Sequence, residues 1–359
     1  MLSPNGFQGH SRAVFGIVRL MHKHLFAIAA LVAAMLSASA HAGKTTDAIR
    51  ERGQLACGVS TGVAGFSAAD SRGEWRGMDV DFCRALAAAV LKDPARVRWS
   101  PLTSQQRFTA LQSGEIDILS RNTTWTLGRD AGQGLVYAGY TFIDGQGFLV
   151  HKRSGVTTAQ QLDGAEICVQ TGTTTERNLA EFARASKIRI KTLMFENLRA
   201  VLKAFFSGRC QAFTADASAL ASIRANDSGK PEDYLVLPER ISEEPLGPLV
   251  RHGDDQWFDI TKWVLFALLN AEELNVTQKN LDEQTKSANP ELKRLLGTEG
   301  NFGEQLGLTR DWVVRIVKHV GNYGEIFERN VGPASLLQLP RGINALPRDG
   351  GVMYSPPLR

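Results

Sequence analysis

Three segments of the chain carry charged or hydroxyl side chains where buried strands are expected to end. They are "SRNTTWTLGRD" (120–130), "QTGTTTE" (170–176) and "GRCQAFTAD" (208–216). Arg129 in the first segment has a guanidinium that can pair with a carboxylate, and Asp216 in the third can pair with an ammonium group. The middle segment predicts a capped helix N-terminus, whose free N–H groups favour an anion. Together these groups match a zwitterion such as a free amino acid.

Each of these features also has a purely structural explanation. Thr173 and Glu176 fit a capping box, so Thr173 and Thr174 could do no more than start a helix. Asp216 could cap the next helix, and Arg129 could be solvated, as most arginines after a loop are. The ligand-binding interpretation therefore depends on all three features meeting at one edge of the fold.

The segment "GVSTG" (58–62) matches G-x-S-x-G, in which a hydrolase nucleophile lies on a tight turn between a strand and a helix. We do not expect Ser60 to be catalytic, because the following segment, 63–75, contains several turn formers and does not predict a helix. A general base also lacks an evident acidic partner. The histidines after residue 42 are His151, His252 and His319.

The elements that must position these groups alternate between strands and helices. Strands are expected at 54–60, 96–102 and 116–120, with helices at 78–91 and 104–114. A second alternation has strands at 166–170, 189–195 and 211–215, with helices at 173–186, 198–208 and 216–226. This pattern predicts two α/β lobes with mainly parallel sheets, which bind ligands at the carboxyl ends of their strands.

The chain is expected to cross between the lobes twice, through extended passages at 140–155 and 235–250, which suggests a hinge. Helices at 257–274 and 311–331 have apolar residues three and four positions apart and are expected to pack on the first lobe. The predicted boundaries are 43–143 and 249–359 for lobe 1 and 144–248 for lobe 2.

Residues 1–42 predict an N-terminal extension and a secretory signal peptide. An apolar run at 25–36 is too short to span a membrane, and Ala40-His41-Ala42 offers the small side chains of a cleavage site. Cleavage after Ala42 would release an exported protein. Met21 is a candidate translation start, because the twenty residues before it resemble neither the start of a signal peptide nor a domain.

Composition argues against two kinds of partner. The net charge is only +4 over 359 residues, and basic residues alternate with acidic ones, so nucleic acid is not expected to bind. A metal site is not expected, because the cysteines form no C-x-x-C pair and no histidines are spaced to complete one.

Four cysteines in an exported chain favour disulfides, since these persist in an oxidising compartment. Three pairings are possible. We favour Cys57–Cys83 and Cys168–Cys210, one in each half of the chain. Four buried free thiols remain the alternative.

Further motifs occur in an order found in one family. "GMDVDFCRALAAAV" (77–90) has a glycine, a large apolar residue and two acidic residues that bracket an aliphatic one, followed by an amphipathic helix; Met78 departs slightly from the usual choice. With the three segments above, and with 245–260 and 321–332, the mature chain resembles the periplasmic substrate-binding proteins of polar amino-acid ABC transporters, solute-binding protein family 3. The last two stretches resemble its general L-amino-acid subgroup.

The resemblance implies a two-lobed periplasmic binding protein fold of type II and a location in the periplasm. It implies broad binding of free L-amino acids, such as glutamate, glutamine, aspartate and asparagine, and delivery to ABC transporter permease subunits at the inner membrane. A monomer without a cofactor is expected. The alternative is an enzyme on the same fold, an exported dehydratase of the cyclohexadienyl or arogenate type, for which Glu176 or Asp216 would be the acid.

The resemblance also implies a role for individual residues. Asp216 would bind the α-ammonium group of the ligand, and Arg129 would pair bidentately with its α-carboxylate. Arg129 would be assisted by Thr124, Thr173 and Thr174, and Asn122 would contribute a further hydrogen bond.

The side-chain end of the pocket is less defined. Many members of the family place an aromatic platform over the ligand side chain, but the matching position here is Val63, which favours a tolerant pocket. Trp125 and Phe66 could line the pocket instead or could pack in the core. Arg121 could contact an acidic ligand side chain or face solvent.

Overall fold

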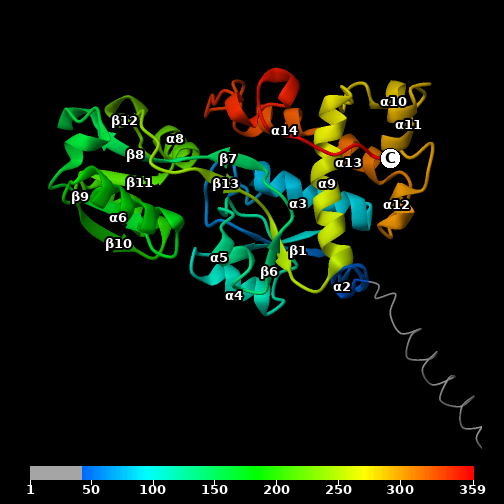
Figure 1. Cartoon of the computed structure of the whole chain (residues 1–359), viewed down its shortest axis with the longest axis horizontal. Helices are drawn as coiled ribbons and strands as arrows, with labels where there is room; N and C mark the ends of the chain where they lie inside the picture. The colour runs from blue at the N-terminus through cyan, green and yellow to red at the C-terminus, as the bar shows by residue number, and fades with distance from the viewer. Residues whose placement is uncertain (1–42) are drawn as a thin grey trace, which may run out of the picture. The chain divides into compact units, whose positions relative to one another are not determined.

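A computed structural model of the chain describes residues 43–359 (Figure 1). The predicted signal peptide and its cleavage site lie outside the described residues. Residues 45–359 form one compact unit, and it is this unit that contains the elements discussed below. Within the described part, no helix combines the length and the apolar character that crossing a membrane requires.

The first sheet of this unit has the strand order β4-β1-β5-β14-β6. Its strands are β1 (Leu55–Val59), β4 (Val97–Pro101), β5 (Ile118–Leu119), β6 (Leu135–Tyr137) and β14 (Leu249–Arg251). Strand β1 runs parallel to β4 and β5, whereas β14 runs antiparallel to its neighbours. We call this sheet and the helices packed on it lobe 1.

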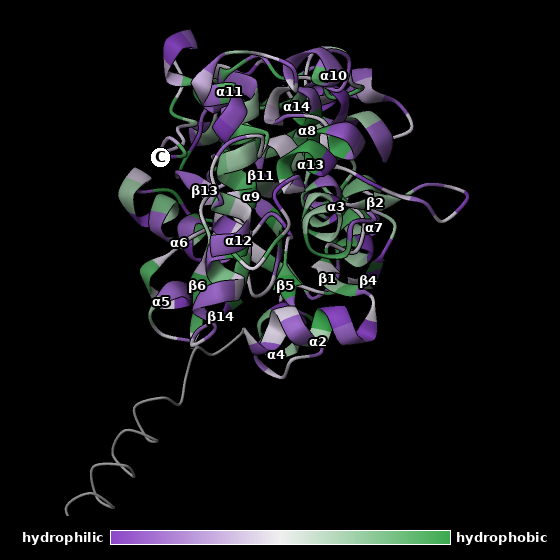
Figure 2. Cartoon of the chain, turned by 90° about the vertical axis from the view of Figure 1, so that its right-hand side faces the viewer, coloured by the Kyte–Doolittle hydropathy of each residue, from purple (hydrophilic) through white to green (hydrophobic). Residues whose placement is uncertain are grey.

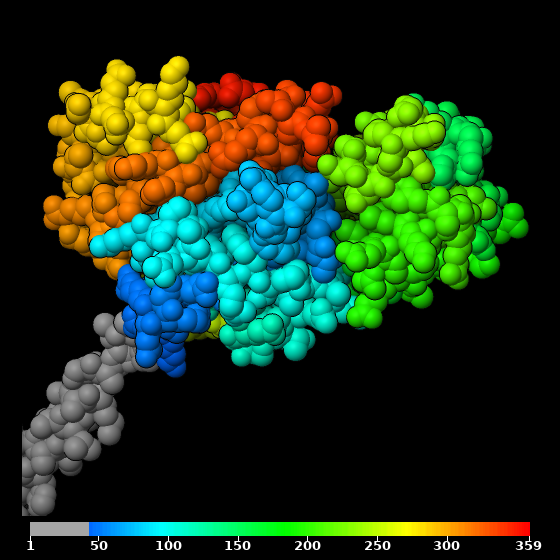
Figure 3. Space-filling view, turned by 180° about the vertical axis from the view of Figure 1, so that it is seen from behind, coloured from blue at the N-terminus to red at the C-terminus, as the bar shows by residue number. Residues whose placement is uncertain are grey.

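The second sheet has the order β10-β9-β11-β8-β12. Its strands are β8 (Gln146–His151), β9 (Glu166–Gln170), β10 (Lys191–Phe195), β11 (Ala212–Asp216) and β12 (Tyr234–Val236). Helices α6 (Thr174–Ser186), α7 (Leu198–Phe206) and α8 (Ala217–Asn226) pack around it. We call this group lobe 2; it is green in Figure 1, and in the space-filling view of Figure 3 it lies against the blue residues of lobe 1. In both sheets the three strands that precede or follow crossover helices are parallel, as the alternation predicts.

The chain passes between the lobes through a two-stranded antiparallel ribbon. Strand β7 (Phe142–Asp144) pairs with β13 (Glu244–Leu246), and both lie within the two extended passages that the sequence predicts as crossings. A short ribbon of this kind can bend while the lobes stay rigid, so we call it the hinge ribbon. The predicted residue limits of the two lobes stay predictions.

The main hydrophobic core of lobe 1 is formed largely by four helices, one from the first third of the chain and three from its last third. They are α3 (Met78–Leu91), α9 (Asp255–Glu273), α13 (Trp312–Val320) and α14 (Tyr323–Asn330), whose apolar residues join one buried cluster. Helix α13 packs on α3, which confirms that the C-terminal helices return to lobe 1. Burying a side chain such as Phe327, which is 0% exposed, contributes about 1.5–3 kcal/mol.

The single helix predicted at 311–331 is wrong, because the chain breaks at Gly321. This residue has φ 84° and ψ −171°, a conformation that a helix cannot continue through. Asn322 then caps α14, and Glu325 completes the capping box. The break lets α14 turn onto α9 and α3.

The remaining elements are short. They are α2 (Lys44–Arg52), β2 (Ala68–Ala69), β3 (Trp75–Arg76), α4 (Gln106–Gln112), α5 (Leu127–Asp130), α10 (Leu281–Gln284), α11 (Pro290–Leu295) and α12 (Phe302–Gln305). Figure 2 shows purple and green residues side by side on α2 and α5, as expected of surface helices that turn one face to the core.

Each lobe contains one disulfide, and the pairing is the predicted one. Cys57 of β1 is joined to Cys83 of α3, with 6.4 Å between the Cα atoms. Cys168 of β9 is joined to Cys210, just before β11, with 5.7 Å between the Cα atoms. The described residues include no free cysteine, so the free-thiol alternative is excluded.

Candidate functional site

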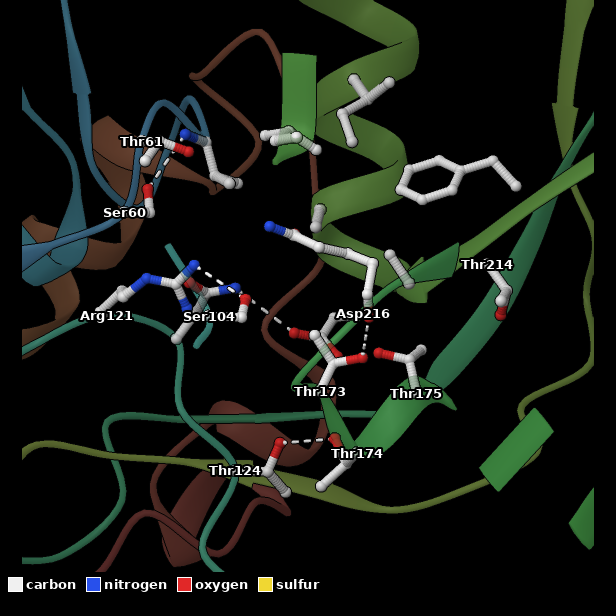
Figure 4. A pocket seen from close by; sticks show the side chains of 18 of the residues that line it. Ser60, Thr61, Ser104, Arg121, Thr124, Thr173, Thr174, Thr175, Thr214 and Asp216 are labelled. Carbon is white, nitrogen blue, oxygen red and sulfur yellow. Dashed lines mark hydrogen bonds between the residues drawn. The ribbon is translucent and has the colours of Figure 1, made fainter. Parts of the chain in front are cut away.

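A cavity lies between the lobes where the carboxyl ends of β1 and β5 face the carboxyl ends of β9 and β11 (Figure 4). Parallel strands are expected to place ligands at this edge. Six of the eight predicted ligand-binding residues line the cavity: Val63, Asn122, Thr124, Thr173, Thr174 and Asp216. Two of the three features on which the interpretation depends, the helix start at Thr173 and the carboxylate of Asp216, therefore meet at this cavity.

Arg129 and Trp125, the other two predicted residues, do not line this cavity. The Nη1 atom of Arg129 donates to the carbonyl oxygen of Thr124 at 2.8 Å, so its guanidinium lies directly behind the cavity wall. The Trp125 ring stacks on Tyr137 with 5.3 Å between centroids, and its Nε1 donates to Asp130 Oδ2 at 2.9 Å. These contacts at its face and at its N–H hold the indole half-buried in lobe 1.

Phe66 also belongs to the core, since it packs edge-to-face on Phe142 at 5.3 Å between ring centroids. The aromatic side chain in the described lining is Phe213 of β11, in lobe 2.

Arg107 of α4 lines the cavity and was not predicted. It is 3% exposed; its Nη1 donates to Thr123 Oγ1 at 3.1 Å, and its Nη2 donates across the cleft to Gly172 O at 3.3 Å. A signal was present in the sequence. Arg107 lies three and four positions before Ala110 and Leu111, so it occupies the apolar face of the helix.

Arg121 lines the cavity and is 5% exposed, which settles the choice between the pocket and solvent. Its Nε donates to Leu102 O at 3.0 Å and its Nη2 to Ser104 Oγ at 3.1 Å (Figure 4). Burial lowers the pKa of Arg121 to about 10, so the guanidinium remains charged at neutral pH.

None of these three arginines has an acidic partner in residues 43–359. No carboxylate oxygen there lies within 4.0 Å of a guanidinium nitrogen of Arg107, Arg121 or Arg129. Buried charges are normally paired, so unpaired cations beside a cavity indicate an anionic ligand.

Asp216 is the matching carboxylate. Its Oδ2 accepts from Asn122 Nδ2 across the cleft at 3.4 Å, and no lysine or arginine nitrogen of the described residues lies within 4.0 Å of it. Burial raises the pKa of Asp216 well above its usual value, and the nearby carboxyls of Asp144 and Glu244 raise it further. A ligand cation would reverse this effect.

Helix α6 begins at the cavity, as predicted. Thr173 Oγ1 accepts from Glu176 N at 3.3 Å, which is the expected cap. The capping box is only half formed, because the Glu176 carboxylate accepts from the N–H of Gly172 at 3.3 Å instead of from the N–H of Thr173. The 13-residue helix therefore directs its positive end at the cavity.

Glu244 of the hinge ribbon was not predicted and joins both lobes. Its Oε2 accepts hydrogen bonds from the hydroxyls of Thr124 in lobe 1 and Thr174 in lobe 2, and its Oε1 accepts from Asn178 Nδ2 at 2.6 Å. The two threonine hydroxyls expected to contact a ligand are thus bound to this buried carboxylate, which is 1% exposed.

Ser60 lines the cavity without the surroundings of a nucleophile. Its Oγ donates to Ser67 O at 2.8 Å, and no histidine is among the described residues that line the cavity. The hydrolase interpretation of the G-x-S-x-G segment therefore has no support from the geometry.

Comparison with known proteins places this architecture in a family. Residues 55–281 match the bacterial extracellular solute-binding proteins, family 3. The chain is 51% identical over 335 residues to the General L-amino acid-binding periplasmic protein AapJ of Rhizobium johnstonii, covering 92% of this chain and 98% of that protein. It is 49% identical to the Glutamate/glutamine/aspartate/asparagine-binding protein BztA of Rhodobacter capsulatus, over 93% of this chain and 97% of that one.

A solved structure agrees with this assignment. The ABC transporter/periplasmic binding protein from Brucella ovis with glutathione bound has a TM-score of 0.86 and 50% identity, covering 88% of this chain and 99% of that chain. The family and the names of these relatives imply a periplasmic location. The resemblance seen in the motifs is thus confirmed: the chain belongs to family 3 of the bacterial extracellular solute-binding proteins and has the type II periplasmic binding protein fold.

Proposed function

We propose that the protein binds a free L-amino acid between its lobes and presents it to the permease of an ABC transporter. The names of AapJ and BztA, at about half identity over nearly the whole chain, support this proposal. The observation that carries it is electrostatic: one cavity is bordered by unpaired guanidinium groups and by an unpaired carboxylate. A zwitterionic ligand pairs both.

In this proposal Asp216 binds the α-ammonium group, and Asn122 supports it through their hydrogen bond. The α-carboxylate binds at the N-terminus of α6, with the hydroxyls of Thr124 and Thr174. Thr173 holds the helix start in place as its cap. Arg129 stays our predicted partner of this carboxylate, since its guanidinium already contacts the Thr124 backbone.

Ligand binding would favour the closed arrangement because each charged end of the ligand has partners on both lobes, Asn122 and Asp216 at one end and Thr124 and Thr174 at the other. Hydrogen bonds to charged groups contribute about 1.5–3 kcal/mol each, so four or five of them contribute about 6–15 kcal/mol before ordering costs, a range that includes the roughly 8 kcal/mol of micromolar binding. To bind the ligand carboxylate, the hydroxyls of Thr124 and Thr174 must give up their hydrogen bonds to Glu244 and donate to the ligand instead. The ligand shifts the equilibrium between open and closed lobes only by as much as it binds the closed state more tightly than the open one.

The remaining parts of the proposal concern the location of the protein, its assembly state and its partners. The protein acts as a monomer in the periplasm after cleavage of its signal peptide at Ala42, and permease subunits at the inner membrane are its partners. It is a receptor and returns its ligand chemically unchanged. This last point separates it from a dehydratase, which would need an acid over the ligand side chain.

The test is calorimetry with the set of L-amino acids, combined with mass spectrometry of each ligand after incubation. We expect micromolar binding of several polar amino acids and no change in their mass. Analogues that lack one of the two charges, such as α-keto acids and primary amines, serve as matched controls and should bind far more weakly. Binding of an analogue as tight as that of its parent amino acid, or conversion of a ligand, would contradict the proposal.

A further inference from the structure

We infer that the cavity recognises a second anionic group on its ligand, the side-chain carboxylate of an acidic amino acid or an equivalent carboxylate on an amino-acid conjugate, and that Arg121 is its principal partner. The inference rests on the proposed function and deepens it, because it assigns the end of the cavity that the ligand backbone does not use. It makes Arg121 a residue that determines specificity.

The hydrogen bonds of Arg121 fix its guanidinium without neutralising it. Leu102 O and Ser104 Oγ accept from Nε and Nη2 at 3.0 and 3.1 Å, and both acceptors are uncharged. Nη1 has no partner among the described residues. A buried guanidinium held by neutral acceptors, with one nitrogen still available, is prepared for a charged acceptor that the protein does not supply.

The available acidic neighbour does not replace such a ligand. Asp79 uses its Oδ2 to accept from Asn122 N at 3.0 Å and its Oδ1 to accept from Ser120 Oγ at 3.3 Å, and no oxygen of it lies within 4.0 Å of Arg121. Burial raises the pKa of Asp79 to about 7, so near neutral pH this carboxyl carries only part of a negative charge.

Arg107 adds a second buried guanidinium to the lining. Its Nε is buried and has no hydrogen-bond partner, and its other contacts are to the neutral oxygens of Thr123 and Gly172. The charged side chains that line the cavity are thus Arg107, Arg121 and Asp216, which leave an excess of one positive charge. A neutral zwitterion leaves this excess, and the charge of Arg129 behind the wall, unchanged, whereas a second carboxylate on the ligand lowers the positive excess by one charge.

The two anion-binding ends are also separate in space. In Figure 4, Arg121 and Ser104 lie on the lobe 1 wall below Ser60, whereas the hydrogen-bonded pair of Thr124 and Thr174 lies apart from them at another side of the cavity. A carboxylate at the start of α6 therefore leaves Arg121 free for another group.

The experiment compares isosteric ligands that differ only in charge: glutamate with glutamine, and aspartate with asparagine. Calorimetry is run on the wild-type protein, on Arg121→Gln and on the control Arg251→Gln. Arg251 is a half-buried arginine of β14 in the same lobe that donates to Leu111 O and Ile116 O and does not line the cavity. Circular dichroism melting verifies that both variants fold.

We expect wild-type protein to bind glutamate more tightly than glutamine. Arg121→Gln should weaken glutamate about tenfold to a hundredfold, the worth of one charge-assisted hydrogen bond or two, and glutamine less than about threefold. The control should leave the ratio of the two affinities unchanged. Equal weakening of both ligands in Arg121→Gln would overturn the inference and leave the proposed function standing.

The wild-type protein alone provides a second test that does not depend on the variant folding. Equal affinity for glutamate and glutamine, and for aspartate and asparagine, would overturn the inference without any mutation. Absence of binding to all four ligands would instead overturn the proposed function, on which the inference rests.

Discussion

Replacing Asp216 with asparagine tests the electrostatic basis of the site, because it removes the charge while keeping the shape of the side chain. This carboxylate accepts one hydrogen bond, from Asn122 at 3.4 Å, and no lysine or arginine nitrogen of residues 43–359 lies within 4.0 Å of it. It is therefore a group whose favourable partner is supplied only by the ligand.

The expected loss of affinity is large. In Asp216→Asn the ligand ammonium group would be buried against a neutral amide, without a negative partner. Removing one partner of a buried, hydrogen-bonded charge pair costs about 2–5 kcal/mol. Asp216→Asn should therefore weaken the binding of any amino-acid ligand by roughly 30-fold to several thousandfold. The change should be similar for glutamate and glutamine, since Asp216 acts on the backbone end.

The same substitution should stabilise the empty protein. The folded protein holds the Asp216 proton more tightly than the unfolded chain, whose pKa is near the model value of 3.8, so ionisation costs stability as the pH rises above that value. The asparagine side chain has no proton to lose in this range, so the ligand-free Asp216→Asn variant should melt at a higher temperature than wild type at pH 7. The difference should shrink towards zero as the pH falls below about 4.

The assay is calorimetry for affinity and thermal melting at pH 7 and pH 4 for stability, both after unfolding and refolding to remove any bound ligand. Asp227→Asn is a control for the substitution itself, because Asp227 is an exposed aspartate at the end of α8 that does not line the cavity. Unchanged affinity in Asp216→Asn would refute the ammonium site. A wild-type protein that gains stability relative to the variant as the pH rises would refute the pKa argument.

Three further predictions concern the framework of the site. Glu244→Gln should weaken the hydrogen bonds that join the lobes at the hinge ribbon and increase the radius of gyration of the ligand-free protein by small-angle scattering; an unchanged radius would contradict this role. Gly77→Ala should lower the melting temperature far more than Gly73→Ala, because both have positive φ but only at Gly77 does a Cβ come within 2.0 Å of the Phe66 carbonyl oxygen; equal losses would show that the close approach is unimportant. Replacing both cysteines of the lobe 2 disulfide with serine should reduce the free energy of unfolding in denaturant by about 4 kcal/mol, from a closed loop with a sequence separation of 42 residues, and a loss below about 1 kcal/mol would be inconsistent with the chain-entropy estimate.

Local patterns predicted most of the elements, because apolar spacing and caps act over a few residues. Helix α3 matches its predicted range of 78–91, and strand β9 matches 166–170. The break at Gly321 was missed because the apolar period continues across it, although the Asn322 to Glu325 capping box is visible in the sequence. The apolar period favours one continuous helix and the capping box favours a new helix start. The second outcome allows α14 to pack on α9 and α3.

The site was only partly predictable, since its charges come from positions that are far apart in the chain. Asp216 and the start of α6 were identified because each follows a strand and so reaches the ligand edge of a sheet. Arg107 was missed because a lone arginine on a helix is usually solvated. Its place on the apolar face of α4 was a signal that it is buried, but its contact with Gly172 of the other lobe is visible only in the structure.

By itself, the sequence determined the two-lobed α/β plan and the family, because these depend on periodicity, spacing and contiguous motifs. It favoured one disulfide pairing among three, and the structure contains that pairing. Only the tertiary structure decided which side chains share the cavity. It turned Arg129 and Trp125 away from the lining, brought Arg107 and Arg121 into it, and set Glu244 between the lobes. The physical reason is that side-chain direction and burial depend on contacts between distant segments, and the sequence order does not contain those contacts.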